Sequence, residues 1–238
     1  MCADDRASAR SEQVVFWDFD GTLASRQGGW RGALIEALTD ANPNHQVSAA
    51  DLAPSLQDGF PWHHPDIEHP HLDTADAWWA ELTARFEPAY TQAGIASQIA
   101  SSAAGLVRQH YCDPRRWTLF PDTRPVLEQL SHAGWRHVVV SNYVPELPEL
   151  VAALGIDNLI ESVVTSAHTG YEKPNPNMFA EAIRRSGTPQ TMWMVGDNPT
   201  ADIAGAEAAG IPAILVRTPN RANGQPLTLH DAAAVINR

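Results

Sequence analysis

The sequence predicts an α/β fold, in which a parallel sheet with helices on both faces is interrupted after its first strand by a mostly helical insert. Two observations predict this architecture. Through the second half of the chain, short apolar runs alternate with amphipathic stretches of helical spacing, which is the pattern of a parallel sheet with crossover helices. Residues 24–114, in contrast, show helical periodicity and no convincing β-type run.

The apolar runs define the expected strands, and the stretches between them define the helices. Several of these helices begin near a proline and end before a glycine, as helix ends favour. The predicted strands are residues 14–19, 137–141, 162–165, 192–196 and 213–216. The predicted helices are residues 121–133, 145–154, 176–186 and 199–209, followed by Gly134, Gly155, Gly187 and Gly210.

The insert is predicted to contain helices at residues 30–38, 75–86 and, more loosely, 95–111. A piece rich in proline and histidine, residues 60–72, is expected to be an ordered loop, and Trp78 and Trp79 are expected to lie in the core of the insert. Residues 1–13 lack the apolar core of a signal peptide and are predicted to be a disordered lead-in. The expected domains are residues 14–23 with 115–238 for the sheet and its helices, and residues 24–114 for the insert.

Composition and charge exclude several classes of function. With 28 acidic against 16 basic residues the formal net charge is -12, and no basic run occurs, so nucleic acid is not an expected partner. No run of about 18 apolar residues occurs, so no membrane partner is expected. Cys2 and Cys112 are too few for a disulfide framework, which favours a reducing, cytoplasmic location.

Polar residues follow four predicted strands, at the end where a doubly wound sheet binds its ligands. Taken singly, each has an ordinary structural explanation, because Asp-Gly suits a turn, Ser-Asn suits a helix cap and a lone lysine suits a solvated loop. Their joint occurrence favours a site. The residues are Asp18 and Asp20 after the first strand, Ser141 and Asn142 at the second, Lys173 after the third, and Asp197 with Asp202 after the fourth.

These residue types share one chemistry. Carboxylates that converge on one edge of a sheet repel each other unless a hard cation joins them, and oxygen ligands favour Mg²⁺. A carboxylate that faces the cleft can act as a nucleophile, while a hydroxyl and an amine can bind the anionic oxygens of a phosphoryl group. The pattern therefore indicates phosphoryl chemistry with Mg²⁺ as cofactor.

At these residues the chain resembles the haloacid dehalogenase (HAD) superfamily of phosphohydrolases. The resemblance lies in DFDGT at residues 18–22, SN at 141–142, the lysine of YEKPNP at 173 and GDNPTAD at 196–202, which occur in the family's order. It extends over residues 14–216. It implies a Rossmann-like core and a mobile helical cap, residues 24–114, with Gly28 and Gly29 as hinge or flap residues.

The resemblance also implies a role for each residue. Asp18 would be the nucleophile that forms an aspartyl-phosphate, and a Mg²⁺ ligand. Asp20 would be the general acid and base, with its backbone carbonyl on the metal. Lys173 would neutralise the phosphoryl oxygens and the nucleophile. Ser141 through its hydroxyl and Asn142 through its backbone N–H would bind the phosphate, and Thr22 would support the phosphate and the geometry of the loop. Asp197 would bind Mg²⁺ directly, and Asp202 would orient Lys173 or a metal-bound water.

The expected function is a Mg²⁺-dependent phosphatase for a small phosphorylated metabolite, either a sugar or organic-acid phosphate or a nucleoside monophosphate. A phosphomutase with the same covalent step, a haloacid dehalogenase and a non-catalytic binding protein are the alternatives. Asp20 argues against dehalogenation, because a halide leaves without a proton whereas an alkoxide needs one. The oligomeric state is open.

Two features of the sequence add separate expectations. His63, His64, His69 and His71 in the cap suggest a zinc site, because imidazoles suit that metal, although no thiolate is near. Tyr143 stands where many members of the family carry a smaller residue or histidine, so it is expected to narrow the pocket edge or add a hydrogen bond. Trp17 is expected to pack under the sheet.

Overall fold

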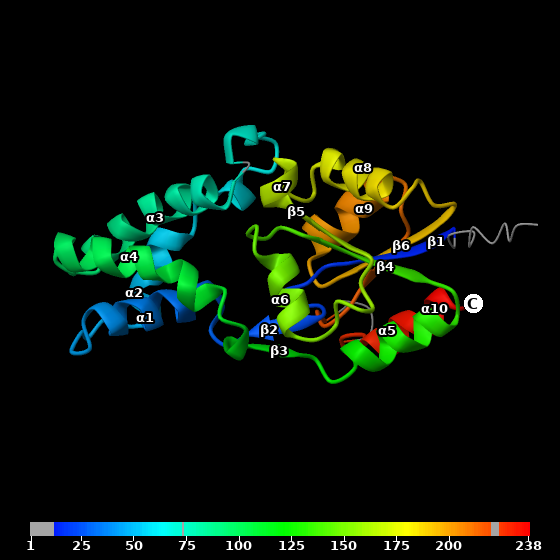
Figure 1. Cartoon of the computed structure of the whole chain (residues 1–238), viewed down its shortest axis with the longest axis horizontal. Coiled ribbons are helices and arrows are strands. Elements are labelled where there is room, and N and C mark those ends of the chain that lie inside the picture. The colour runs from blue at the N-terminus through cyan, green and yellow to red at the C-terminus, as the bar shows by residue number, and fades with distance from the viewer. Residues whose placement is uncertain (1–11, 73, 220–223) are drawn as a thin grey trace, which may run out of the picture.

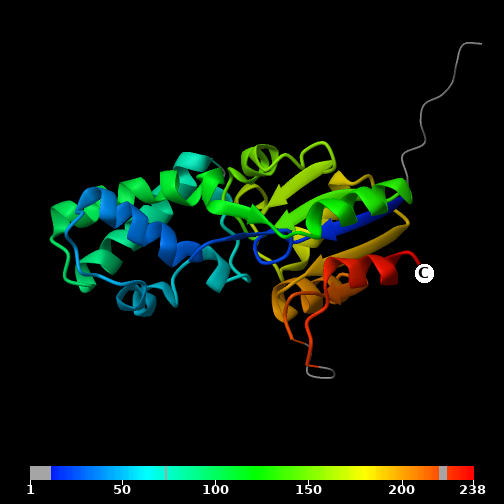
Figure 2. The ribbon, with the colours of Figure 1, turned by 90° about the horizontal axis from the view of Figure 1, so that it is seen from below.

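A computed structural model describes residues 12–72, 74–219 and 224–238. The sheet and its helices form one end of an elongated molecule, and the helices of the cap form the other (Figure 1). The same division is seen from below (Figure 2). Of the predicted disordered lead-in, residues 1–11 lie outside the described residues, while Gln13 already belongs to the first strand. No described helix is long and apolar enough to cross a membrane.

Five parallel strands form the sheet, in the order β5-β4-β1-β6-β7. Because β1 lies between β4 and β6, the residues that follow these three strands meet at one edge. All five predicted strands are confirmed, although β1 begins one residue earlier and ends two residues earlier than predicted. The bounds are β1 Gln13–Trp17, β4 Arg136–Ser141, β5 Ser162–Thr165, β6 Thr191–Gly196 and β7 Ala213–Leu215.

The strands are apolar throughout because both faces of the sheet are buried. In β1, Val14 and Phe16 join one hydrophobic cluster, whereas Val15 and Trp17 join the other, as the two-residue repeat of a strand requires. Trp17 packs beneath the sheet as expected. Its indole N–H donates to Nδ1 of the buried His137 at 3.0 Å.

The helices predicted between the strands are present on the two faces of the sheet (Figure 1). They are α5 Thr123–His132, α6 Leu147–Ala153, α8 Pro176–Arg185, and a π-helical turn, Pro199–Ala204, that continues into α9 Gly205–Ala208. The single turn α7 Ser166–Thr169 and the helix α10 Leu229–Ile236 were not predicted. The capping box of Thr228 and Asp231 is the sequence signal that could have revealed α10.

In the part of the cap that the structure describes, the three predicted helices and a short fourth are present. They are α1 Gly29–Ala41, α2 Ala49–Leu52, α3 Ala75–Gln92 and α4 Ser97–Tyr111, and α1 and α3 both pack on α4. Helix α3 continues six residues past its predicted end, through Pro88, because Tyr90 is buried and its hydroxyl donates to the Leu34 carbonyl at 2.7 Å. Pro88 has no N–H to donate to the Ala84 carbonyl, but both residues are exposed, so that carbonyl can bind water instead.

Short 3₁₀ turns complete the cap. The predicted ordered loop, residues 60–72, contains Pro61–His63 and Pro70–Leu72, and further turns lie at Ala53–Leu56 and Pro114–Arg116. The expected core position of Trp78 and Trp79 is confirmed, because both are buried.

An antiparallel ribbon joins the two ends of the cap, and it corrects the prediction that residues 24–114 contain no strand. It consists of β2 Ala24–Arg26 and β3 Trp117–Leu119. A three-residue strand is too short to show alternation, and its partner lies at the far end of the insert. The buried Arg26 secures the ribbon to the cap, because its Nη2 donates to Glu36 Oε2 at 2.5 Å and to the His110 carbonyl at 3.1 Å.

Candidate active site

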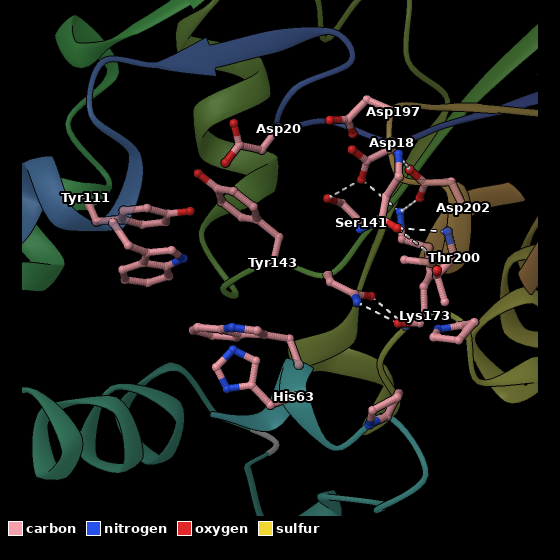
Figure 3. A pocket seen from close by; sticks show the side chains of 17 residues that line it. Asp18, Asp20, His63, Tyr111, Ser141, Tyr143, Lys173, Asp197, Thr200 and Asp202 are labelled. Atoms are coloured by element: carbon pink, nitrogen blue, oxygen red, sulfur yellow. Dashed lines mark hydrogen bonds and ion pairs between the residues drawn. The ribbon is translucent and has the colours of Figure 1, made fainter. Parts of the chain in front are cut away.

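Three neighbouring strands bring Asp18, Ser141 and Asp197 to one edge of the sheet. Asp18 follows β1, and its backbone N–H still donates to the Val195 carbonyl of β6 at 2.9 Å, so the sheet ladder holds its position. Ser141 ends β4, and its hydroxyl donates to Asp18 Oδ1 at 2.9 Å. Figure 3 shows both side chains beside Asp197. The predicted convergence at the carboxyl edge is therefore present.

Lys173 is the cation of this group. Its buried Nζ donates to Asp18 Oδ1 at 2.8 Å, to Asp202 Oδ1 at 2.5 Å and to the Val140 carbonyl at 2.8 Å. Burial opposes the charge of Lys173, but the carboxylates of Asp18 and Asp202 outweigh it and raise the pKa above its usual value. Lys173 is therefore an ammonium ion, and each of its three N–H donors has an acceptor.

Asn142 holds the loop that carries Lys173. Its side-chain Nδ2 donates to the Lys173 carbonyl at 2.9 Å, and its Oδ1 accepts from the Lys173 N–H at 2.6 Å. Both the nitrogen and the oxygen of the Asn142 side chain are therefore engaged by the backbone of Lys173. The side chain thus positions the lysine, which leaves the backbone of Asn142 for the predicted contact with phosphate.

Thr22 is placed differently from its predicted position at the phosphate. Its side chain is fully buried and does not line the cavity; Oγ1 lies 3.4 Å from Asp18 Oδ2 and 3.5 Å from Asp197 Oδ1. Thr22 therefore supports two carboxylates from behind. The preceding Gly21 has φ +89°, and a Cβ there would lie 2.5 Å from Asp197 Oδ2, so glycine is required for Asp197 to approach.

Asp20 projects into the cavity beside Asp18 (Figure 3). Burial, with the negative charges of Asp18 and Asp197, raises the pKa of Asp20 to about 7. Burial and Asp18 also raise the pKa of Asp197, to about 6. A carboxyl group with a pKa near neutrality can both give and take a proton, as a general acid and base must.

A cluster of carboxylates could hold a cation. Oxygens of Asp18, Asp197 and Asp202 lie within 4.8 Å of one another, and this set of hard oxygen donors suits Mg²⁺. Asp202 has both oxygens engaged, one by Lys173 and the other by the Asn198 N–H at 3.0 Å, which agrees with its predicted orienting role. The predicted metal contact through the Asp20 carbonyl stays a prediction.

The four cap histidines do not converge, so the structure gives the zinc hypothesis no support. His63 lines the cavity, His64 pairs with Asp58 at 3.0 Å, and His71 is exposed. His69 is buried, and its Nε2 lies 3.3 Å from Oε1 of Glu172, the residue that precedes Lys173. Among the described residues, none of the four belongs to a group that could hold a metal ion.

A cavity of about 520 Å³ lies between the carboxyl edge of the sheet and the cap. Tyr143 lines it, as expected. Other lining residues were not expected from the sequence, because helical spacing predicts burial without distinguishing a core from a cavity wall. These residues include Trp30, Trp62 and Tyr111 from the cap and Thr200 from the π-helical turn.

A sequence model of the haloacid dehalogenase-like hydrolases matches residues 12–210. The chain belongs to this family. A glyceraldehyde 3-phosphate phosphatase of Methanothermobacter thermautotrophicus is 39% identical to this HAD hydrolase over 118 residues, or 49% of this chain and 52% of that protein. A phosphoserine phosphatase of Thermus thermophilus is 31% identical over 150 residues, or 62% of this chain and 59% of that protein.

The chain thus aligns with little more than half the length of these two relatives. Among solved structures, the HAD hydrolase YfnB of Bacillus subtilis, bound to magnesium, has a TM-score of 0.72 against this chain at 17% identity. The match covers 96% of this chain and 100% of that one. This likeness shows that the two chains share the HAD fold.

Proposed function

We propose that this HAD hydrolase is a Mg²⁺-dependent phosphatase that hydrolyses a small phosphorylated metabolite through an aspartyl-phosphate. One observation carries the proposal: Asp18 Oδ1 accepts hydrogen bonds from Ser141 and Lys173 beside Asp20, whose pKa is raised to about 7. The activities named for the two relatives support a phosphate ester as the substrate.

In the first step a carboxylate oxygen of Asp18 attacks phosphorus, and the bond between phosphorus and the leaving oxygen breaks. Asp20 gives its proton to that oxygen, so the alcohol leaves neutral. Ser141 and Lys173 already lie at the nucleophile, where their donors can bind phosphoryl oxygens as charge develops.

In the second step Asp20, now a carboxylate, removes a proton from water as the water oxygen attacks phosphorus. The bond to Asp18 then breaks, which releases phosphate and restores the free carboxylate. Asp202 and Asn142 hold Lys173 in place through both steps.

Asp18, Asp197 and the Asp20 carbonyl would hold Mg²⁺. The fit rests on charge, because Asp18, Asp197 and Asp202 gather beside the ammonium of Lys173, and burial together with the charge of Asp18 raises the pKa of Asp20 and Asp197. When bound, the ion supplies positive charge that lets carboxylates and phosphate share the site.

The division into core and cap is part of the proposal. Residues 14–23 and 115–238 would carry the chemistry, while residues 24–114 would close over the substrate and exclude water, with Gly28 and Gly29 at the hinge. The cytoplasmic location stays a prediction from the scarcity of cysteine.

Release of inorganic phosphate from p-nitrophenyl phosphate, with Mg²⁺ or with EDTA, tests the proposal. We expect Mg²⁺-dependent release that Asp18→Asn abolishes. The control is Asp58→Asn, which changes an exposed carboxylate in the cap, outside the cavity. An Asp18→Asn enzyme with the wild-type rate would overturn the assignment.

A further inference from the structure

We propose that the alcohol released by this enzyme is uncharged and carries a flat aromatic ring, which the cap binds against its tryptophans. This inference names the substrate class of the phosphatase and therefore rests on the proposed function. Its basis is the contrast between the two walls of the cavity. One wall holds the polar groups of the carboxyl edge, and the other holds Trp30, Trp62, His63, Pro65 and Tyr111 from the cap.

The cap wall offers no charge to a leaving group. Lys173 is the one lysine or arginine among the described lining residues, and its Nζ is engaged by Asp18, Asp202 and the Val140 carbonyl. Burial lowers the pKa of His63, which favours its neutral form at neutral pH. A carboxylate or second phosphate on the leaving group would lose its hydration without gaining a cation, and an ammonium would find no carboxylate on this wall.

The aromatic residues of the wall are stacked in advance. Trp30 and Trp62 are both half-buried, and their rings stack with centroids 5.4 Å apart and planes 18° apart. Tyr111 in turn stacks on Trp30, with centroids 3.6 Å and planes 7° apart, and Phe60 stacks on Trp62, with centroids 4.8 Å and planes 9° apart. A ring that binds such a wall orders few side chains, so the entropic cost of binding is small.

The cavity has room and polar groups for a ring with a few substituents. Its volume of about 520 Å³ is in the range of sites that hold ligands larger than a three-carbon chain. In Figure 3, the hydroxyls of Tyr111 and Tyr143 lie next to each other near Asp20, and His63 lies lower in the same view. The His63 imidazole can hydrogen-bond a neutral oxygen or nitrogen substituent, which suits an uncharged alcohol.

Four phosphate esters of primary alcohols test the inference, because their leaving oxygens have similar reactivity. Benzyl phosphate carries a ring, cyclohexylmethyl phosphate carries an apolar group without a flat face, phosphoglycolate carries a carboxylate and phosphoserine carries both charges. We expect kcat/KM for benzyl phosphate to exceed that for cyclohexylmethyl phosphate about tenfold, and that for each charged ester by more. Equal or higher values for a charged ester would overturn the inference.

Two variants of Trp62 sharpen the test. Trp62→Leu should bring the ratio of benzyl to cyclohexylmethyl kcat/KM close to one, mainly through KM for benzyl phosphate. Trp62→Arg should raise kcat/KM for phosphoglycolate relative to benzyl phosphate. The control is Trp193→Leu, which changes a half-buried tryptophan outside the cavity and should keep the wild-type ratios.

Unchanged ratios in both Trp62 variants would contradict the inference while leaving the phosphatase intact. Failure of the wild-type enzyme to release phosphate from any of the four esters or from p-nitrophenyl phosphate would instead contradict the proposed function.

Discussion

The ammonium of Lys173 lies 2.5 Å from Asp202 Oδ1, and both side chains are buried. The second oxygen of Asp202 accepts from the Asn198 N–H, which ties it to the turn after β6. A Cβ on Gly196 would lie 2.2 Å from Asp202 Oδ2, so the carboxylate packs directly on that strand end. Asp202 therefore fixes the lysine that contacts Asp18.

Replacing Asp202 tests this positioning role. Asp202→Asn keeps the shape but removes the charge that holds Lys173, so we expect kcat for p-nitrophenyl phosphate to fall about 10- to 100-fold with little change in KM. Circular dichroism should show a folded protein. Glu207→Gln, an exposed change on α9, serves as the control. A kcat equal to that of the wild type in Asp202→Asn would exclude the role.

The raised pKa of Asp20 predicts how the rate depends on pH. As the general acid, Asp20 is active while protonated, so kcat/KM for an alkyl phosphate should decline as pH rises above about 7. Asp20→Asn should slow hydrolysis of an alkyl phosphate about 100-fold or more, and that of p-nitrophenyl phosphate less, since nitrophenolate leaves without a proton. Equal losses for the two esters would argue against proton donation by Asp20.

Gly21 lies against the proposed metal ligand Asp197, and Gly94, where a Cβ would meet no other group, provides a matched control. Both have positive φ, +89° and +87°, so alanine at either position carries a similar backbone cost of about 1 kcal/mol. At Gly21 the new Cβ would strike Asp197, whereas at Gly94 no atom lies within 4 Å. We expect Gly21→Ala to raise the Mg²⁺ concentration for half-maximal activity about tenfold. Gly94→Ala should leave that concentration unchanged, and the same value in both variants would refute the clash.

His137 predicts a loss of stability in mild acid. Burial of the imidazole lowers its pKa from 6.5 to about 4, and the hydrogen bond between Nε2 and the Leu127 carbonyl at 3.0 Å offsets only part of this shift. As pH falls, the imidazole is protonated in the unfolded chain before it is protonated in the folded protein. The stability that neutral His137 contributes is therefore complete above about pH 6.5 and is lost as pH falls towards 4. The loss is about 3 kcal/mol of unfolding free energy.

Urea denaturation of the wild type and of His137→Gln, at pH 7 and at pH 4.5, measures this contribution. The glutamine variant should be less stable at pH 7, and its unfolding free energy should depend less on pH between the two values. The same difference between pH 7 and pH 4.5 in both proteins would show that His137 does not titrate as predicted.

The sequence could predict the polar edge of the sheet but not the cap wall. Asp18, Ser141 and Asp197 each follow an apolar run, and parallel strands align their carboxyl ends, so their meeting follows from local pattern. Trp30 and Tyr111 lie far apart in the sequence, and their stacking depends on how α1 packs on α4. No periodicity encodes that packing.

Thr22 and β2 show the same limit at short range. Thr22 belongs to the expected motif, but the turn at Gly21 directs its side chain into the protein, next to Asp18. The identity of the residue does not predict this direction. β2 forms because β3 is available beside it, and neither three-residue strand carries a pattern of its own.

The covalent step at Asp18 is the central claim, and trapping it is the most direct measurement. Wild-type enzyme is mixed with p-nitrophenyl phosphate and Mg²⁺, quenched in acid within one turnover, digested and analysed by mass spectrometry. We predict one phosphoryl group on the peptide that contains Asp18, absent from Asp18→Asn. Phosphate release at the wild-type rate with no phosphorylated peptide, or with the phosphoryl group on another residue, would contradict the account.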